Sequence, residues 1–301
     1  MSNSQAQSDV DELFDVKNSY YIGNFQQCIK EAQKAKVSSA DIKLERDIYL
    51  YFAYIAQKKY KIVIDEVNDK SPVELQALKL LAEYMLTPNR RASILDTFVG
   101  KFGSSEIENH YVILVGATMY FFDEQIEKAL QLLHLDDHLE SLSLTLQIYL
   151  HMSRTDLARR ELKKMQDKDE DSTLTQLAQA WVNIFLGRDK LQDAYYTLQE
   201  IIDKYGSSIS LLNCQAVCYI GQGKYEEADS VLQEAMEKDS NDANTLINSI
   251  VLSANISKFS EMGSRYLTQL RESYPDSPFV TEFNEKEKEF DHLCQEYGIM
   301  V

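Results

Sequence analysis

Three aspartates, Asp167, Asp169 and Asp171, have the spacing that opens a calcium-binding loop. That loop needs glycine at its sixth position and glutamate at its twelfth, where this chain has Ser172 and Ala178. We therefore expect a solvated turn in which Asp171 or Ser172 caps the next helix. The sequence does not predict a calcium site here.

Two cysteines and two histidines are spaced so that a helix could present them to a metal. Cys214 and Cys218 are four residues apart, as are His134 and His138. Zinc sites need further ligands, which neither pair has nearby in sequence. We expect reduced, buried thiols at all four cysteines and no metal or cofactor. The cysteines are Cys28, Cys214, Cys218 and Cys294, and the histidines are His110, His134, His138, His151 and His292.

A short glycine-containing motif, Gly221 to Lys224, contains G-x-G-K but has neither the preceding strand nor the spacing of a phosphate loop. We interpret it as a turn between helices. No serine, cysteine or carboxylate motif indicates an activated nucleophile. We do not expect an enzyme.

The charge balance argues against some partners. The chain has 31 basic and 48 acidic residues and a formal net charge of −17, which repels nucleic acid and anionic lipid. It opens with MSNSQAQSD, which does not resemble a secretory signal. The apolar stretch 111–122 is shorter than the roughly 20 residues that cross a bilayer. We expect a cytosolic protein without direct membrane insertion.

The sequence predicts that helices position all of the candidate residues named above. Glycine and proline are few, with 10 and 4 residues, and no stretch alternates as a strand would. The segment 212–240 places Ala216 and Tyr219 on one helix, breaks at Gly221 to Lys224, and continues with Ala228, Leu232 and Ala235 at helical spacing. That pattern is typical of the tetratricopeptide (TPR) hairpin of about 34 residues. Because one hairpin cannot bury its apolar faces, others must stack on it.

The same frame fits eight times, at steps of 29 to 36 residues. It starts at Asp9, Leu44, Glu74, His110, Leu139, Thr175, Ile209 and Ala243. The position before the turn is aromatic at Tyr54, Tyr84, Tyr120, Tyr149, Phe185 and Tyr219. The position where the second helix crosses the first has Cys28, Val63, Ser93, Ala129, Ala158, Ala194, Ala228 and Met262. Met262 and Ser253 fit poorly, so the last repeat is the weakest.

The predicted fold is all-α: a TPR-like right-handed α-solenoid of about eight helix-turn-helix repeats plus a C-terminal capping helix. We expect a disordered tail at 1–8, the solenoid at 9–276 and the capping helix at 277–301. In that helix Phe279, Phe283, Phe290 and Leu293 can close the end of the stack.

The first helix of each hairpin should line a concave groove, where the frame places one residue in every three or four. These residues are Val10, Leu13, Lys17, Tyr20, Glu45, Ile48, Phe52, Ile55, Leu75, Leu78, Ala82, Met85, Tyr111, Leu114, Thr118, Phe121, Glu140, Ser143, Gln147, Leu150, Gln176, Gln179, Asn183, Leu186, Ser210, Asn213, Val217, Ile220, Asn244, Ile247, Val251 and Ala254. Only one of them is basic, which disfavours an acidic peptide tail as ligand.

The first half of this predicted groove is apolar, and the second half is rich in amides that can pair with an extended chain. The helices at 48–56 and 111–122 are apolar almost all round and must be covered on both sides. Either a tight superhelix covers them with its own residues or a bound polypeptide fills the groove. As partner-binding residues we predict Phe52, Phe121, Gln147, Gln179, Asn183 and Asn213.

Several segments resemble the epsilon subunit of coatomer, the COPI vesicle coat. They are 11–33 (DELFDVKNSYYIGNFQQCIKEAQ), 45–60, 72–84, 156–182 (DLARRELKKMQDKDEDSTLTQLAQAWV) and 190–200. The stretches DELFDVKN and DLARRELKKMQDKDED are specific, because a generic repeat does not require them.

The resemblance implies a non-catalytic coat component that curls around an extended segment in the C-terminal region of the alpha coatomer subunit, as a heterodimer within a larger complex. It also implies recruitment from cytosol to Golgi membranes and COPI vesicles, for retrieval to the endoplasmic reticulum. The alternatives are a TPR scaffold of an unrelated cytosolic complex, which would copurify without coatomer subunits, and an enzyme, which would need a polar pocket with a perturbed titrating group.

Overall fold

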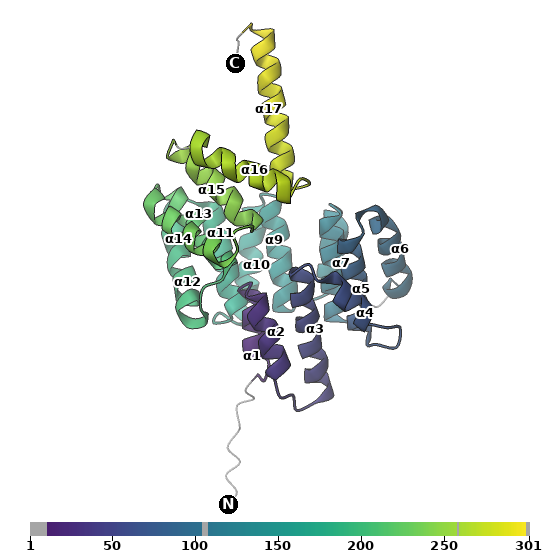
Figure 1. Cartoon of the computed structure of the whole chain (residues 1–301). Helices are drawn as coiled ribbons and strands as arrows, with labels where there is room; N and C mark the ends of the chain where they lie inside the picture. The colour runs from purple at the N-terminus through teal and green to yellow at the C-terminus, as the bar shows by residue number, and fades with distance from the viewer. Residues whose placement is uncertain (1–10, 104–107, 258, 299–301) are drawn as a thin grey trace, which may run out of the picture. The chain divides into compact units, whose positions relative to one another are not determined.

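The computed structural model describes residues 11–103, 108–257 and 259–298. Within these ranges the chain forms seventeen α-helices and no strands (Figure 1). It divides into two compact units, one up to Leu186 and one from Gly187 onward, called unit 1 and unit 2 below. The predicted tail at 1–8, and also Asp9 and Val10, lie outside the described residues.

Unit 1 contains helices α1 to α11. Their bounds are α1 Phe14–Tyr21, α2 Phe25–Lys34, α3 Ala40–Ala56, α4 Tyr60–Glu66, α5 Val73–Leu86, α6 Arg91–Phe102, α7 His110–Phe122, α8 Ile126–Leu133, α9 Leu139–His151, α10 Thr155–Lys168 and α11 Thr173–Leu186. A 3-10 turn, η1 Pro88–Arg90, precedes α6.

Unit 2 contains helices α12 to α17. Their bounds are α12 Lys190–Tyr205, α13 Ile209–Gly221, α14 Tyr225–Lys238, α15 Ala243–Asn255, α16 Ser264–Ser273 and α17 Pro278–Glu296. A π-helical segment, η2 Phe259–Gly263, precedes α16 and falls in the repeat that fitted the sequence frame least well.

The predicted hairpins coincide with observed helix pairs. The frame starts at His110, Leu139, Ile209 and Ala243 are the first residues of α7, α9, α13 and α15. The all-α, TPR-like fold class is therefore confirmed. At the sixth hairpin, α11 ends unit 1 and α12 begins unit 2.

Most hairpin turns share one backbone device, a residue with positive φ just before the second helix, and the turn between α5 and α6 lacks it. Glycine supplies it at Gly23, but Lys58, Glu124 and Ser153 adopt φ of 58° to 59°. A side chain in this left-handed region is strained by roughly 1 kcal/mol, whereas glycine is not. The repeat therefore fixes the turn geometry even where the sequence lacks glycine.

Small residues at the helix crossings form the centre of the core. Cys28, Val63, Ala129, Ala158, Ala194 and Ala228, predicted at these positions, are completely buried. Two predicted positions differ. Ser93 is exposed, and the neighbouring Ile94 is buried in its place, while Met262 is only partly buried. In α6 and in the last hairpin, the frame is therefore displaced or incomplete.

Unit 1 curls far enough for its first helix to contact its last. α1 lies against α11, and Tyr21 of α1 packs on the apolar cluster that includes Leu174 of α11. Polar contacts also join α1 to α3 and α9. The hydroxyls of Tyr21 and Tyr49 are 2.8 Å apart, and both donate to the Glu140 carboxylate of α9.

A second polar bridge links α1, α3 and α7. Lys17 of α1 forms an ion pair with Glu45 of α3 at 2.9 Å, and the Tyr111 hydroxyl of α7 donates to the same carboxylate at 3.1 Å. Helices that are distant in sequence are thus held at defined positions around the inner face.

The Glu140 carboxyl feels opposing influences. Burial raises its pKa, but hydrogen bonds from Tyr21 and Tyr49 and the nearby His110 lower it, and the net pKa lies below the ordinary value. The folded state therefore favours the carboxylate, which stabilises unit 1 at neutral pH.

The C-terminal helix α17 closes unit 2 with only its first turns. Phe279 and Phe283 pack on the core formed by α15 and α16, as predicted. Phe290 and Leu293 were also expected to close the stack, but they are 59% and 50% exposed. Figure 1 shows why: α17 extends away from α15 and α16 after its first turns. Across the described part of the chain, no helix combines the length and apolarity needed to span a bilayer.

The strained turns predict a stabilising substitution. Glu124→Gly and Ser153→Gly should each raise the free energy of unfolding by about 0.5 kcal/mol, because relief of left-handed strain exceeds the added entropy of the unfolded chain. Trp181 is the only tryptophan and lies in unit 1, so its fluorescence during urea unfolding measures the effect.

Glu127→Gly is the matched control, because Glu127 is exposed in the first turn of α8, three residues after Glu124. There glycine should destabilise unit 1 by up to about 1 kcal/mol. Equal destabilisation by Glu124→Gly and Glu127→Gly would contradict the strain argument.

The lowered pKa of Glu140 predicts how the stability of unit 1 depends on pH. Because its folded-state pKa is lowered, its contribution is complete above the unfolded pKa of about 4.3 and is lost as the pH falls through the folded pKa. Glu140→Gln should therefore cost about 1–3 kcal/mol at pH 7, and the gap from the unmodified chain should narrow below about pH 4. Trp181 fluorescence against urea at several pH values measures this gap.

The control for this series is Glu127→Gln, which alters an exposed carboxylate. It should change stability little at any pH. A Glu140→Gln penalty that stayed constant from pH 7 to pH 3 would be inconsistent with a stabilised carboxylate.

Candidate functional site

A pocket of about 460 Å³ opens on the inner face of unit 1. The first helices of all six hairpins that begin in this unit contribute to it, namely α1, α3, α5, α7, α9 and α11. Its lining residues are Tyr20, Tyr21, Phe52, Ile55, Ala56, Lys58, Tyr60, Leu81, Met85, Leu114, Thr118, Phe122, Glu140, Ser143, Leu144, Gln147 and Leu174. Part of the predicted groove in unit 1 therefore coincides with a hollow, whereas Leu13, Ile48 and Leu78, also predicted to line it, are completely buried.

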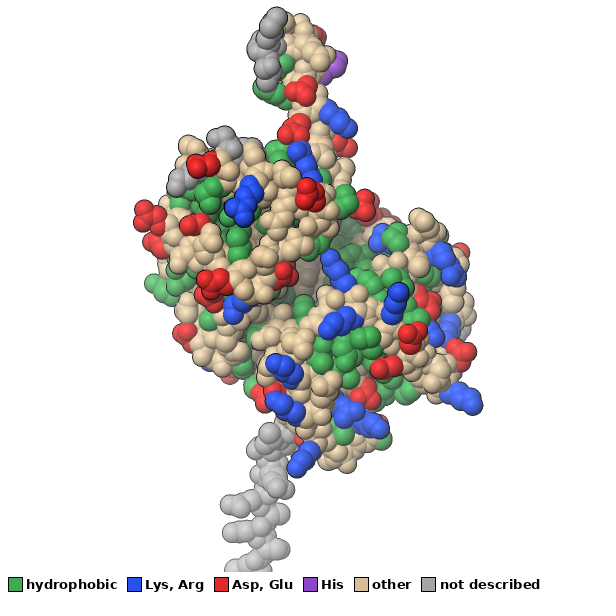
Figure 2. Space-filling model, viewed as in Figure 1, with side chains coloured by type: hydrophobic (Ala, Val, Ile, Leu, Met, Phe, Trp, Pro, Cys, Tyr) green, Lys and Arg blue, Asp and Glu red, His purple; other side chains and the backbone are tan. Residues whose placement is uncertain are grey.

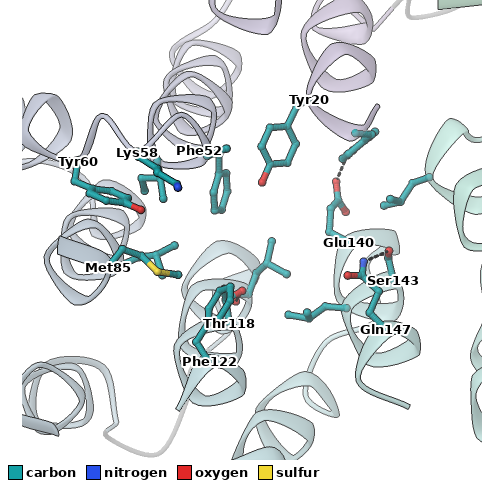
Figure 3. Close-up of a pocket in the computed structure, with 17 residues that line it drawn as sticks. Tyr20, Phe52, Lys58, Tyr60, Met85, Thr118, Phe122, Glu140, Ser143 and Gln147 are labelled. Atoms are coloured by element: carbon teal, nitrogen blue, oxygen red, sulfur yellow. Dashed lines mark hydrogen bonds between the residues drawn. The ribbon is translucent and has the colours of Figure 1, made fainter. Parts of the chain in front are cut away.

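Most of the wall is apolar or aromatic. Figure 3 shows Tyr20 and Phe52 on one side of the opening, with Thr118 and Phe122 on the other. The Phe122 side chain is 51% exposed, although its neighbours on α7 are largely buried. An exposed ring beside a hollow favours contact with another apolar group.

Three polar residues of α9, Glu140, Ser143 and Gln147, lie together at one side of the pocket. The Glu140 carboxylate is oriented by its tyrosine partners, and the Gln147 amide donates to the Ser143 hydroxyl at 3.4 Å (Figure 3). Burial raises the pKa of Tyr20 and of Tyr60, so both phenols are neutral at pH 7. The pocket therefore combines a broad apolar wall with a few fixed donors and acceptors.

This arrangement is suited to binding. A carboxylate whose pKa is lowered, as at Glu140, is a weak base and is better at accepting a hydrogen bond than at removing a proton. Apolar walls with few convergent polar groups bind apolar side chains and orient them. The site is suited to hold part of another chain.

Two of the six predicted binding residues, Phe52 and Gln147, line the pocket. Phe121 lies one position from the lining. Its ring packs edge-on against His151 at 5.4 Å between centroids, and Phe122 takes the place at the pocket. On α7 the sequence frame therefore identified Phe121 as the groove residue, whereas the next residue, Phe122, lines the pocket.

The three predicted amide residues lie elsewhere. Gln179 and Asn183, on α11, bond to each other at 3.1 Å, and Gln179 also accepts from Gln166. Asn213 belongs to unit 2, where it donates to Thr245 at 2.9 Å and accepts from Asn248 at 2.8 Å.

The lining residues that the sequence frame missed have recognisable origins. Lys58 and Tyr60 come from the turn and second helix of their hairpin, where the frame expected no groove residues. Tyr21 and Leu174 reach the pocket because α1 curls back to α11. No local pattern could have indicated this closure, because it depends on the summed rotation of the hairpins.

A cluster of potential metal ligands also lies in unit 1. His110, Asp136 and His138 bring ligand atoms within 4.8 Å of one another, although they are not spaced as a motif in sequence. The Asp136 carboxylate already accepts from both imidazoles, each at 2.6 Å, and from Ser141. These bonds tie the α8–α9 connection to α7, which accounts for the cluster without a metal.

The other chemical candidates have structural roles. The Asp169 carboxylate accepts backbone N–H groups from Asp171 and Ser172 at 3.1 and 3.0 Å and so forms the turn before α11. Burial raises the pKa of Cys214 to about 11 and that of Cys218 to about 12. Such thiols are unreactive near neutral pH.

Solved structures support the fold. A tetratricopeptide repeat protein from Parabacteroides merdae aligns over 90% of this chain and 95% of its own, with 14% identity and a TM-score of 0.53. A chain of the APC/C hetero-tetramer Cut9-Hcn1 aligns over 95% of this chain and 57% of its own, with 12% identity and a TM-score of 0.62.

Curated relatives are more specific. Coatomer subunit epsilon-1 of Arabidopsis thaliana is 36% identical, covering 96% of this chain and 98% of the relative. Coatomer subunit epsilon of Dictyostelium discoideum is also 36% identical, covering 93% and 97%. The sequence model of the coatomer epsilon subunit family matches residues 9–298. With its helical hairpins and its inner-face pocket, this chain therefore belongs to the coatomer epsilon subunit family.

Proposed function

We propose that this protein is a non-catalytic adaptor of the COPI coat, and that the unit 1 pocket binds an extended segment from the C-terminal region of the alpha coatomer subunit. Membership of the epsilon family supports a role as a coatomer subunit. The observation that carries the binding proposal is the pocket itself, an apolar hollow ringed by the first helices of unit 1.

The composition of the pocket supports a polypeptide ligand. Phe52 and Met85 offer apolar contacts, while Gln147 and Glu140 can bond to the backbone N–H groups of an extended strand. A segment in this place would cover Phe122, whose exposure is otherwise unfavourable. The curl of unit 1 therefore covers part of the apolar inner face with the chain's own residues, and the bound segment would cover the part that stays exposed at Phe122.

Four other residues were predicted to contact the partner, but they do not line the pocket, and we propose indirect roles for them. They are Phe121, Gln179, Asn183 and Asn213. Phe121 supports the exposed ring of Phe122, its neighbour. The amides of Gln179, Asn183 and Asn213 bond within their own units. They would contact a longer segment only by exchanging those bonds.

The proposed cellular location of the protein follows from its proposed place in the coat. We propose that the protein is cytosolic when unassembled and peripheral on Golgi membranes and COPI vesicles, where it acts in Golgi-to-ER and intra-Golgi transport. The net charge of −17 disfavours direct contact with anionic lipid, so attachment would come through the alpha subunit, paired one to one.

The pocket can be tested with charged substitutions. Met85→Glu combined with Phe122→Glu should weaken binding to the C-terminal region of the alpha subunit by about 100-fold, because two carboxylates would be desolvated in an apolar contact. Calorimetry with the purified proteins measures the affinity. Circular dichroism should show unchanged helix content, because Phe122 is half exposed and Met85 partly exposed.

Val99→Glu is the matched control. Val99 is 48% exposed, close to the 51% of Phe122, but it lies on α6, a second helix that does not line the pocket. It should leave binding unchanged. Retained binding by the pocket variant would refute the pocket assignment, and purification from cells without coatomer subunits would point to a scaffold of another complex.

A further inference from the structure

Phe290 and Leu293 in the last two turns of α17, together with Tyr297 just after the helix ends, form a regular apolar stripe. Phe290, Leu293 and Tyr297 are 59%, 50% and 75% exposed, and they follow one another at steps of three and four residues. The same steps continue backward through the exposed Lys286 to Phe283 and Phe279, which are partly buried because they pack on α15 and α16. Alternating steps of three and four produce the seam by which one helix packs on another in a coiled coil.

The charges beside the seam are also regular. If Phe283, Phe290 and Tyr297 occupy position a of a heptad, position d holds Phe279, Lys286 and Leu293. Every g position is then glutamate, at Glu282, Glu289 and Glu296, and all three are exposed, whereas the e positions on the other side hold Val280, Glu287 and Cys294. Figure 2 shows charged side chains along α17 where it extends from the rest of unit 2.

These charges argue against a second copy of this chain. In a parallel pair, Glu282 would face Glu287 of the other copy, and in an antiparallel pair glutamates at g would face each other. Lys286 would add a further like charge within the seam. An acidic helix is also repelled by anionic lipid.

We propose that this face of α17 docks an amphipathic helix of another protein whose apolar seam is flanked by Lys or Arg. Lysine or arginine at its e and g positions would pair with Glu282, Glu289 and Glu296, while its apolar residues would cover Phe290, Leu293 and Tyr297. An acidic residue opposite Lys286 would set the register, as single polar seam residues do. This surface lies in unit 2 and is distinct from the unit 1 pocket.

The hollow beside α17 is consistent with this occupant. It is lined by Phe283, Lys286, Phe290, Glu287 and Asp291, so two rings of the seam share it with acidic groups. Glu287 is held by Arg271 of α16 at 2.5 Å, and Lys286 pairs with Glu289 at 2.9 Å. A basic partner would add to this charge network.

Designed peptides can serve as probes. One three-heptad peptide has Ile at a, Leu at d, a single Glu opposite Lys286 and Lys at every e and g position, and its twin has Glu at every e and g position. The full chain should bind the lysine peptide about tenfold tighter or more than the glutamate peptide in fluorescence anisotropy. Phe290→Ala with Leu293→Ala should remove that binding without changing the helical signal, because both residues are half exposed or more.

A charge reversal separates specific docking from general attraction to an acidic protein. Glu282→Lys, Glu289→Lys and Glu296→Lys together should reverse the preference between the two peptides. The matched control reverses the exposed Glu226, Glu227 and Glu237 of α14, with the same change in net charge, and should keep the preference for the lysine peptide.

Equal binding of both peptides, or reversal by the α14 control as well, would overturn the proposal. Sedimentation equilibrium gives an independent outcome: a dimer that dissociates on Phe290→Ala with Leu293→Ala would make a second copy the occupant and contradict a basic partner helix.

Discussion

Among the first helices of unit 1, α7 and the C-terminal half of α3 are apolar on more than one face, and water has to be excluded from each of those faces. α7 has seven buried residues out of thirteen and no charged residue after its first position. Stacking covers one side of such a helix, since each hairpin packs on its neighbours. The other side faces inward. Unit 1 covers part of it by curling until α1 contacts α11, with the polar bridges to Glu140 and Glu45 fixing that closure.

The closure leaves a hollow on the inner face, and this hollow is the proposed binding site. A tighter curl would fill the inner face with the chain's own side chains, whereas a looser one would expose far more apolar surface. The observed pocket leaves Phe122 exposed beside a few oriented polar groups, while Phe52 forms part of its wall and is only 8% exposed. A core-like wall that is open on one side is what a segment of another protein can complete. Membership of the coatomer epsilon family and the open apolar pocket therefore both favour a role in binding another protein.

The sequence indicated the helical hairpins because their signals are local. Helical spacing, aromatic residues before turns and small residues at crossings occur within one repeat, so His110 and Ile209 could be identified as helix starts. Phe52 and Gln147 follow from the same frame. The missed features are not local. Tyr21 reaches the pocket through the curl, and Lys58 through a strained turn that the sequence does not mark with glycine. The exposure of Phe290 likewise depends on how far α17 continues past its contact with α16.

We propose that the inner face of unit 1 holds a segment of the alpha coatomer subunit, and a photoreactive phenylalanine at position 122 in the assembled coat can test this. We expect crosslinks from position 122 to the C-terminal region of the alpha subunit, identified by mass spectrometry, and none from the same group at Val99 on α6. Crosslinks from position 99 with none from position 122 would show that the partner lies on the outer helices instead of in the pocket.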